Sequence, residues 1–140
     1  MKFFEDAVLQ ARKRGHLVCG DHYLCRRTPE ATVLILCDGV GSGVYANVAA
    51  VTCASRLYAL LEEGCSLRAA CSMVAESMHR ARTEEIPFAA FVVARILPGG
   101  QYTAYAYENP GPVHIKQGVA AACEQRFLTC LLYTSPSPRD

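Results

Sequence analysis

The chain has 140 residues, which is enough for one compact domain and too few for two. Apolar residues make up 51% of it, so a buried core is expected. Because 14 basic side chains nearly balance 13 acidic ones, the composition argues against nucleic acid or a charged membrane surface as a partner.

The N-terminus and the cysteines both predict a cytoplasmic protein. Lys2 is followed by Glu5 and Asp6, where a secretory signal would have an apolar stretch. No apolar run approaches the length of a membrane span. The 8 cysteines include no C-x-x-C pair, which argues against a structural zinc site, and without an export signal we expect their thiols to be reduced.

The first elements expected along the chain are a helix and two strands. Residues 5–14 predict a short charged helix, and residues 17–27 predict a strand with a kink at Gly20. A turn follows at residues 28–30. The continuous aliphatic run 32–37 is typical of a strand that is buried on both faces, and it ends at Asp38.

Two consecutive helices are expected next. The first begins after the glycine-rich loop 39–43 and ends at Gly64. Its apolar stripe is predicted from Val44, Val48, Val51, Tyr58 and Leu61, widened by Ala50, Cys53, Leu57 and Leu60. Ser66 is expected to cap the second helix, whose buried face would hold Leu67, Ala70, Cys71, Val74 and Met78.

The remaining elements are predicted to be strands. Residues 88–97 and 101–107 form a hairpin about Gly99 and Gly100, and a half-buried strand begins at Val113. Two adjacent helices between groups of antiparallel strands indicate an α+β fold with helices packed on a sheet.

Residues 129–140 are set apart from this pattern. Their hydrophobic periodicity stops, and the segment is similar to the translated adapter or vector tails found at the ends of assembled reading frames. The alternative is a natural disordered tail. Residues 1–128 are therefore the expected domain.

Two aspartates next to glycines are the candidate functional residues. Asp38 and Gly39 follow the buried strand, and Gly20 and Asp21 lie on the preceding one. If the two strands pair about the turn at residues 28–30, Asp38 lies opposite residue 20 or 21. Carboxylate and carbonyl oxygens are ligands that Mg²⁺ and Mn²⁺ select. The alternative is that both pairs are ordinary turn residues.

The glycine loop 39–43 is a poor match to nucleotide-binding motifs. No Gly-Lys-Ser/Thr follows it, so it is not a P-loop, and Val44 stands where the third glycine of a dinucleotide-binding fingerprint would be. The following helix N-terminus could still attract an anion.

Three motifs carry a family resemblance. Cys19-Gly20-Asp21-His22-Tyr23 is followed, seventeen positions after Asp21, by Asp38-Gly39-Val40-Gly41-Ser42-Gly43, and Glu108-Asn109-Pro110-Gly111-Pro112 comes later. Together they resemble the SpoIIE-like bacterial branch of the PP2C-type metal-dependent protein serine/threonine phosphatases. The resemblance implies a β-sandwich flanked by antiparallel helices, in αββα layers, incomplete at the C-terminus.

The same resemblance implies a mechanism. Asp38 would bridge two Mn²⁺ or Mg²⁺ ions, the Gly39 carbonyl would ligate one, and Asp21 would lie beside the same centre. A metal-bound hydroxide, and no side-chain nucleophile, would attack phosphoserine or phosphothreonine. The substrate would be a regulatory phosphoprotein, with an anti-anti-sigma-type protein as the candidate.

The chain departs from the family pattern in its acidic residues. The family carries further aspartates downstream, including a second Asp-Gly, whereas after Gly111 this chain has only Asp140, within the suspect tail. The alternative function is therefore a non-catalytic, phosphatase-like binding module with an incomplete metal site. A nucleotide-binding protein that uses the glycine loop is a third and less favoured hypothesis.

Overall fold

The computed structural model describes residues 4–11, 14–15, 18–41, 43–122, 125–128 and 131–134, the last two ranges as backbone. In chain order its elements are β1 (Asp21–Arg27), β2 (Thr32–Val40), α1 (Val44–Glu62), α2 (Leu67–Thr83), β3 (Phe88–Ile96), β4 (Tyr102–Tyr107), β5 (Val113–Lys116), β6 (Val119–Ala122), β7 (Gln125–Leu128) and β8 (Leu131–Thr134).

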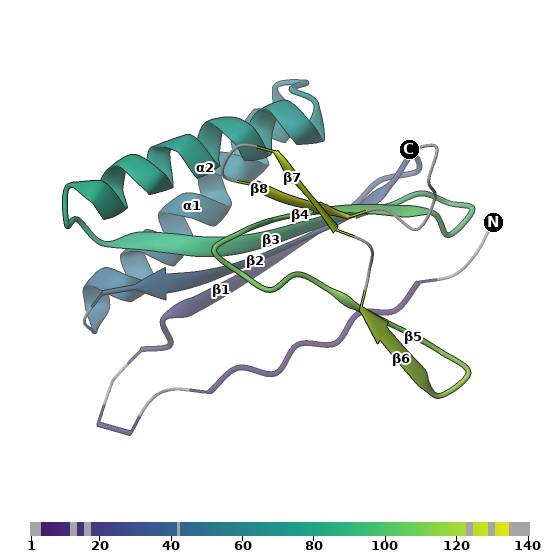
Figure 1. The fold of residues 1–140 in the computed structure, drawn as a ribbon, viewed down its shortest axis with the longest axis horizontal. Coiled ribbons are helices and arrows are strands. Elements are labelled where there is room, and N and C mark those ends of the chain that lie inside the picture. The colour runs from purple at the N-terminus through teal and green to yellow at the C-terminus, as the bar shows by residue number, and fades with distance from the viewer. Residues whose placement is uncertain are drawn as a thin grey trace.

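These elements form a helical layer on an antiparallel sheet (Figure 1). The main sheet has six strands in the order β1-β2-β3-β4-β8-β7, and β5 and β6 form a separate two-stranded ribbon. Helices α1 and α2 cover one face of the main sheet, and the ribbon lies on its other side. The predicted α+β class is confirmed. Of the expected αββα layers, the described residues form one helical layer, one large sheet and the ribbon.

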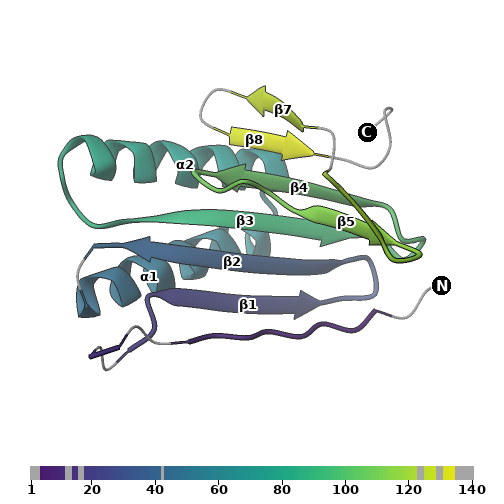
Figure 2. The same ribbon diagram turned by 60° about the horizontal axis from the view of Figure 1, so that its bottom comes forward.

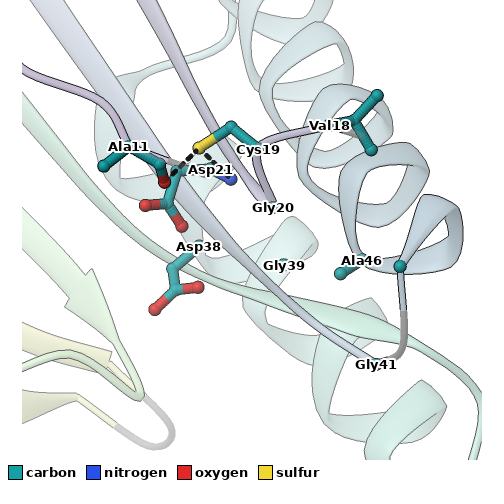
Figure 3. Close-up of a pocket in the computed structure, with 10 residues that line it drawn as sticks. Ala11, Val18, Cys19, Gly20, Asp21, Asp38, Gly39, Gly41 and Ala46 are labelled. Atoms are coloured by element: carbon teal, nitrogen blue, oxygen red, sulfur yellow. Dashed lines mark hydrogen bonds between the residues drawn. The ribbon is translucent and has the colours of Figure 1, made fainter. Parts of the chain in front are cut away.

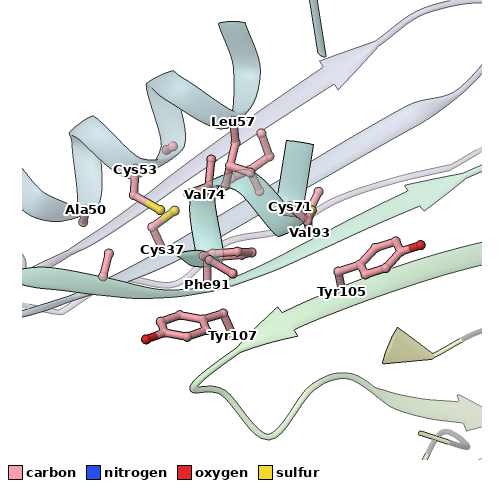
Figure 4. Packing of buried hydrophobic residues seen from close by; sticks show 14 of the residues in the cluster. Cys37, Ala50, Cys53, Leu57, Cys71, Val74, Phe91, Val93, Tyr105 and Tyr107 are labelled. Carbon is pink, nitrogen blue, oxygen red and sulfur yellow. The ribbon is translucent and has the colours of Figure 1, made fainter. Parts of the chain in front are cut away.

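The core lies between the helices and the sheet (Figure 4). Its largest fully buried side chains include Phe91 and Tyr107, whose ring centroids are 5.8 Å apart. Cys37 of β2 points toward Cys53 of α1 in this layer. A hydrogen bond with Cys53, together with burial, raises the pKa of Cys37, so its thiol stays protonated.

Strand β2 is longer than predicted and is buried on one face. The structure continues it to Val40, beyond the expected end at Asp38. Val33, Ile35 and Cys37 are buried under the helices, whereas Leu36 on the opposite face is 42% exposed. The prediction of burial on both faces is therefore wrong, because among the described elements the helices cover only one face of the main sheet.

Helix α1 buries only part of the stripe expected of it, because Ala50, Cys53 and Leu57 are buried as predicted but the valines at its start are not. Val44 and Val48 are 61% and 53% exposed, although both were assigned to the buried stripe. The buried residues are mostly small: Ala46, Ala50, Cys53, Ala54 and Leu57. Small side chains let the helix backbone approach the sheet closely. The alanines therefore face the sheet, and the larger Val44 and Val48 do not. Within the described part of the chain, α1 alone has the length and composition of a membrane span, a test that core helices also pass.

Helix α2 agrees with the prediction. The Ser66 hydroxyl accepts a hydrogen bond of 3.1 Å from the Ala69 amide, which caps the helix. The predicted face is buried, with Leu67, Ala70, Cys71 and Val74 in the core and Met78 packed against it.

The N-terminal segment is not helical where the structure describes it. A helix was predicted over residues 5–14, but residues 5–11 have no regular secondary structure, so the prediction is wrong there. Asp6 accepts a hydrogen bond of 2.7 Å from the Tyr23 hydroxyl and also pairs with Arg27. These contacts draw the segment alongside β1, where it runs extended (Figure 2). Long-range contacts with β1 therefore outweigh the weak local helix propensity.

Two predictions for the C-terminal part of the chain can be compared with the structure. Strand β5 is exposed along its whole length, so its predicted half-burial is wrong; among the described strands it pairs with β6 alone. Strand β8 pairs with β4, with Tyr133 opposite Tyr105, and lies inside the segment 129–140 that was set apart. Residues 129–130 and 135–140 lie outside the described residues, and the domain boundary at residue 128 stays a prediction.

Candidate metal centre

Asp21 and Asp38 are partners in the β1–β2 pairing, as the hairpin argument predicted. The Gly39 amide donates a hydrogen bond of 2.8 Å to the Gly20 carbonyl, so residues 20 and 39 form a hydrogen-bonded pair. Such pairs alternate with non-hydrogen-bonded ones along an antiparallel ladder. Asp21 and Asp38 therefore occupy a non-hydrogen-bonded pair, in which facing side chains come closest.

Both carboxylates lie on the same face of the sheet. Cys37 is fully buried beneath the helices, so Asp38, one residue on, points to the opposite face. Figure 3 shows the Asp21 and Asp38 carboxylates side by side on that face, away from α1. Two like charges placed opposite each other repel, and a cation bound by both would offset that repulsion.

A small pocket of about 110 Å³ contains this pair. Its lining comes from the N-terminal segment, the start of β1, the end of β2 and the start of α1: Ala11, Val18, Cys19, Gly20, Asp21, Asp38, Gly39, Gly41, Gly43 and Ala46. The N–H and C=O of one strand residue face the same neighbouring strand, so the Gly39 carbonyl points toward Gly20 and the pocket. The structure thus brings all three predicted ligands, Asp21, Asp38 and Gly39, to one pocket.

Gly39 is also required by packing. A Cβ at this position would lie 1.8 Å from the Ala46 carbonyl oxygen and 2.8 Å from the Gly20 oxygen. No side chain fits there, because both contacts are backbone atoms that cannot rotate away. The first turn of α1 therefore packs directly on the end of β2, and this close approach carries the α1 N-terminus to the pocket.

The loop between β2 and α1 depends on glycine conformations. Gly41 has φ +149°, and a Cβ there would meet the Pro87 ring at 3.3 Å. Gly43, the N-cap of α1, has φ +56° and supplies no side chain to cap the helix. Ser42 lies outside the described residues.

Sequence reasoning missed two amide side chains that hold the start of β1 and the residue Cys19 before it. Asn47 of α1 donates a hydrogen bond of 2.8 Å to the Cys19 carbonyl. Gln10 of the N-terminal segment donates one of 2.9 Å to the Asp21 carbonyl. A polar Asn47 among the apolar residues of the first helical turns was a usable signal, whereas nothing local distinguishes Gln10.

No sequence model of a protein family and no curated protein sequence matches the chain. Solved structures do match. The PP2C phosphatase domain of SpoIIE from Bacillus subtilis superposes with a TM-score of 0.67 at 21% identity, covering 92% of this chain and 34% of that one. RsbX in complex with magnesium gives 0.59 at 19% identity over 72% of this chain and 48% of that chain. The fold is that of a PP2C-type phosphatase.

A third solved structure with the PP2C-type fold extends the comparison. It contains the RsbU and RsbW domains of a Mycobacterium tuberculosis protein and matches with a TM-score of 0.59 at 19% identity, over 72% of this chain and 29% of that one. This chain thus spans about half the length of the RsbX chain and about a third of the SpoIIE chain.

The donor set of this PP2C-type fold suits a hard divalent cation. Mg²⁺ is commonly held by one or two carboxylates while it keeps several water ligands, and Mn²⁺ accepts the same oxygens. The Asp21 and Asp38 carboxylates with the Gly39 carbonyl meet this minimum. Within the part of the chain that the structure describes, no cluster of three or more His, Cys, Asp and Glu side chains is placed to hold a metal.

Proposed function

We propose that this domain takes part in metal-dependent hydrolysis of phosphoserine or phosphothreonine on a regulatory protein. The observation that carries the proposal is the Asp21–Asp38 pair, which faces one pocket beside Gly39 on a PP2C-type fold. RsbX, one of the proteins with this fold, was crystallised in complex with magnesium, which supports Mg²⁺ or Mn²⁺ as the cofactor.

Each residue has a distinct task in this proposal. Asp38 would bridge two ions, the Gly39 carbonyl would ligate one of them, and Asp21 would hold the same centre directly or through water. When bound, the ions would supply Lewis-acid activation of water and of the phosphoryl oxygens. The pairing of Asp21 with Asp38 concentrates negative charge at one point of the sheet, and this local field would attract the cations.

The substrate class is inferred from the structures that share the fold. One of them is described as part of the bacterial stressosome, and another contains RsbU and RsbW domains. Both descriptions support a signalling protein as the partner. An anti-anti-sigma-type phosphoprotein in the cytoplasm is the specific candidate that we propose.

Phosphate release from a phosphoserine protein tests the activity. The chain, and the protein encoded by its full reading frame, are assayed with Mn²⁺, with Mg²⁺ and with EDTA. Asp38→Asn is compared with Glu30→Gln, which removes a carboxylate at the distant β1–β2 turn. We expect EDTA and Asp38→Asn to abolish release and Glu30→Gln to leave it unchanged; activity that survives in the Asp38 variant would overturn the mechanism.

A non-catalytic binding module is the second candidate. Asp21 and Asp38 are the only acidic residues among those lining the described pocket, which is a small set for a binuclear centre. In this case the chain would bind a phosphoprotein without releasing phosphate. Binding measured by calorimetry, with no phosphate released from the full-length protein in Mn²⁺, would select this function.

A further inference from the structure

The N-terminal segment is tied to the fold at two places. At one, Asp6 contacts the Tyr23 hydroxyl and the Arg27 guanidinium, and the Arg27 side chain also donates a hydrogen bond of 3.2 Å to the Phe4 carbonyl. The other lies beside the candidate metal centre. Between these two places the segment runs alongside β1 (Figure 2).

The second attachment centres on Cys19 and Asp21. The Gln10 amide donates to the Asp21 carbonyl at 2.9 Å, and its nitrogen lies 3.8 Å from the Cys19 sulfur. That sulfur donates to the Ala11 carbonyl at 3.5 Å and accepts from the Asp21 amide at 3.4 Å (Figure 3). The segment therefore contacts the residue whose carboxylate is a candidate ligand.

Asn47 holds the same stretch from the opposite side. Its amide reaches from the first turns of α1 and donates to the Cys19 carbonyl at 2.8 Å. Residues 19–21 are thus fixed by two side-chain amides, one from the N-terminal segment and one from the helical layer. Neither Gln10 nor Asn47 is among the residues that line the pocket, so each acts on the site through the backbone carbonyl that it holds.

The position of Asp21 explains why such support is needed. Asp21 is the first residue of β1, which lies at the edge of the main sheet beside β2, and the ladder continues past it by the hydrogen bond from the Gly39 amide to the Gly20 carbonyl. Its carboxylate also faces that of Asp38, and like-charge repulsion pushes the strand end away. A strand end with few hydrogen bonds opens at low free-energy cost unless other contacts tie it down.

We propose that Gln10 and Asn47 are positioning residues of the metal centre, and that the N-terminal segment contributes to the centre through Gln10. They hold residues 19–21 so that the Asp21 carboxylate stays opposite Asp38. Residues that orient metal ligands typically change metal affinity about 10–100-fold when removed. The inference rests on the proposed metal centre and adds residues to it that do not touch the ion.

Mn²⁺ titration of the 140-residue chain, followed by water-proton relaxation, tests the inference without any enzymatic readout. Gln10→Leu and Asn47→Leu remove the donors at similar side-chain size. Leu9→Ala, at a side chain that is 97% exposed, and Ser55→Ala, on the exposed side of α1, are the matched controls. We expect each Leu variant to weaken Mn²⁺ binding by about ten-fold or more and both controls to bind as the parent does.

Metal-free thermal unfolding separates positioning from loss of fold. Because Gln10 is exposed, Gln10→Leu is expected to unfold at the parent temperature while binding Mn²⁺ more weakly. If both Leu variants bind Mn²⁺ as the parent does while Asp38→Asn does not, the positioning inference fails and the metal centre stands. If the parent and Asp38→Asn bind Mn²⁺ equally, or neither binds it, the metal centre itself fails.

Discussion

Asp21 and Asp38 occupy a single cross-strand pair at one end of β1 and β2, with both carboxylates on the sheet face that the helices leave open. Like charges directly opposite each other in a sheet repel and are destabilising. A cation held by both carboxylates would offset that repulsion. The response of the chain to such a cation can be measured directly.

Asp38→Asn is expected to remove the response of the chain to Mn²⁺, because it removes one of the two facing carboxylates. Mn²⁺ should raise the melting temperature of the parent and of Glu30→Gln, because a ligand bound only by the native state stabilises it. A melting temperature of Asp38→Asn that rises with Mn²⁺ as much as that of the parent would contradict the assignment.

Gly39→Ala should be much more destabilising than Gly20→Ala, although the two glycines face each other. A Cβ at Gly39 would lie 1.8 Å from the Ala46 oxygen, whereas one at Gly20 would make an ordinary contact of 3.5 Å with the Ala46 side chain. We expect Gly39→Ala to lower the free energy of unfolding by about 1–3 kcal/mol or more. Urea unfolding of the two variants checks this, and equal stabilities would show that α1 does not pack on β2 as described.

The six described cysteines should divide into two classes of reactivity. Cys19, Cys25 and Cys65 are half-buried, and Cys37, Cys53 and Cys71 are buried. Burial raises the pKa of Cys71, so little of the reactive thiolate is present at mildly alkaline pH. Brief alkylation with iodoacetamide, followed by peptide mapping, should label the first class only. Adding denaturant should label the buried class as well, and its labelling in the native protein would contradict the packed core.

The N-terminal segment should detach from β1 in acid. The Tyr23 hydroxyl, and then Arg27, lower the pKa of Asp6 below its ordinary value of 3.8. Because the folded pKa is the lower one, this contact stabilises the attached segment above pH 3.8, and the contribution is lost as the pH falls below that value.

Amide chemical shifts of residues 4–11 follow this detachment as the pH is lowered past 3.8. Asp6→Asn should weaken the attachment at neutral pH, because it removes the charge that pairs with Arg27. Glu5→Gln is the control, since the Glu5 side chain is exposed. An acid transition that is unchanged in Asp6→Asn would assign the pH dependence to another group.

Local sequence patterns were sufficient for the order of the elements from β1 to β5 and for the central pair. The turn at residues 28–30 is short, so β1 and β2 can pair in few registers, and the observed one places Asp21 opposite Asp38 as predicted. Ser66 and the apolar spacing of α2 are likewise local features, and both predictions are confirmed. Such features survive folding because they depend on neighbours in the chain.

Only the tertiary structure decided which residues support the site. The buried side of the first turns of α1 was misassigned because close packing on β2 requires the small Ala46, whereas hydrophobicity alone favours the larger Val44 and Val48. The N-terminal segment is extended because Asp6 and Gln10 find partners on β1 and beside it, and no local periodicity records such partners. The sequence by itself thus determined the two carboxylates and their pairing, and the three-dimensional packing determined what holds them in place, because those contacts join residues far apart in the chain.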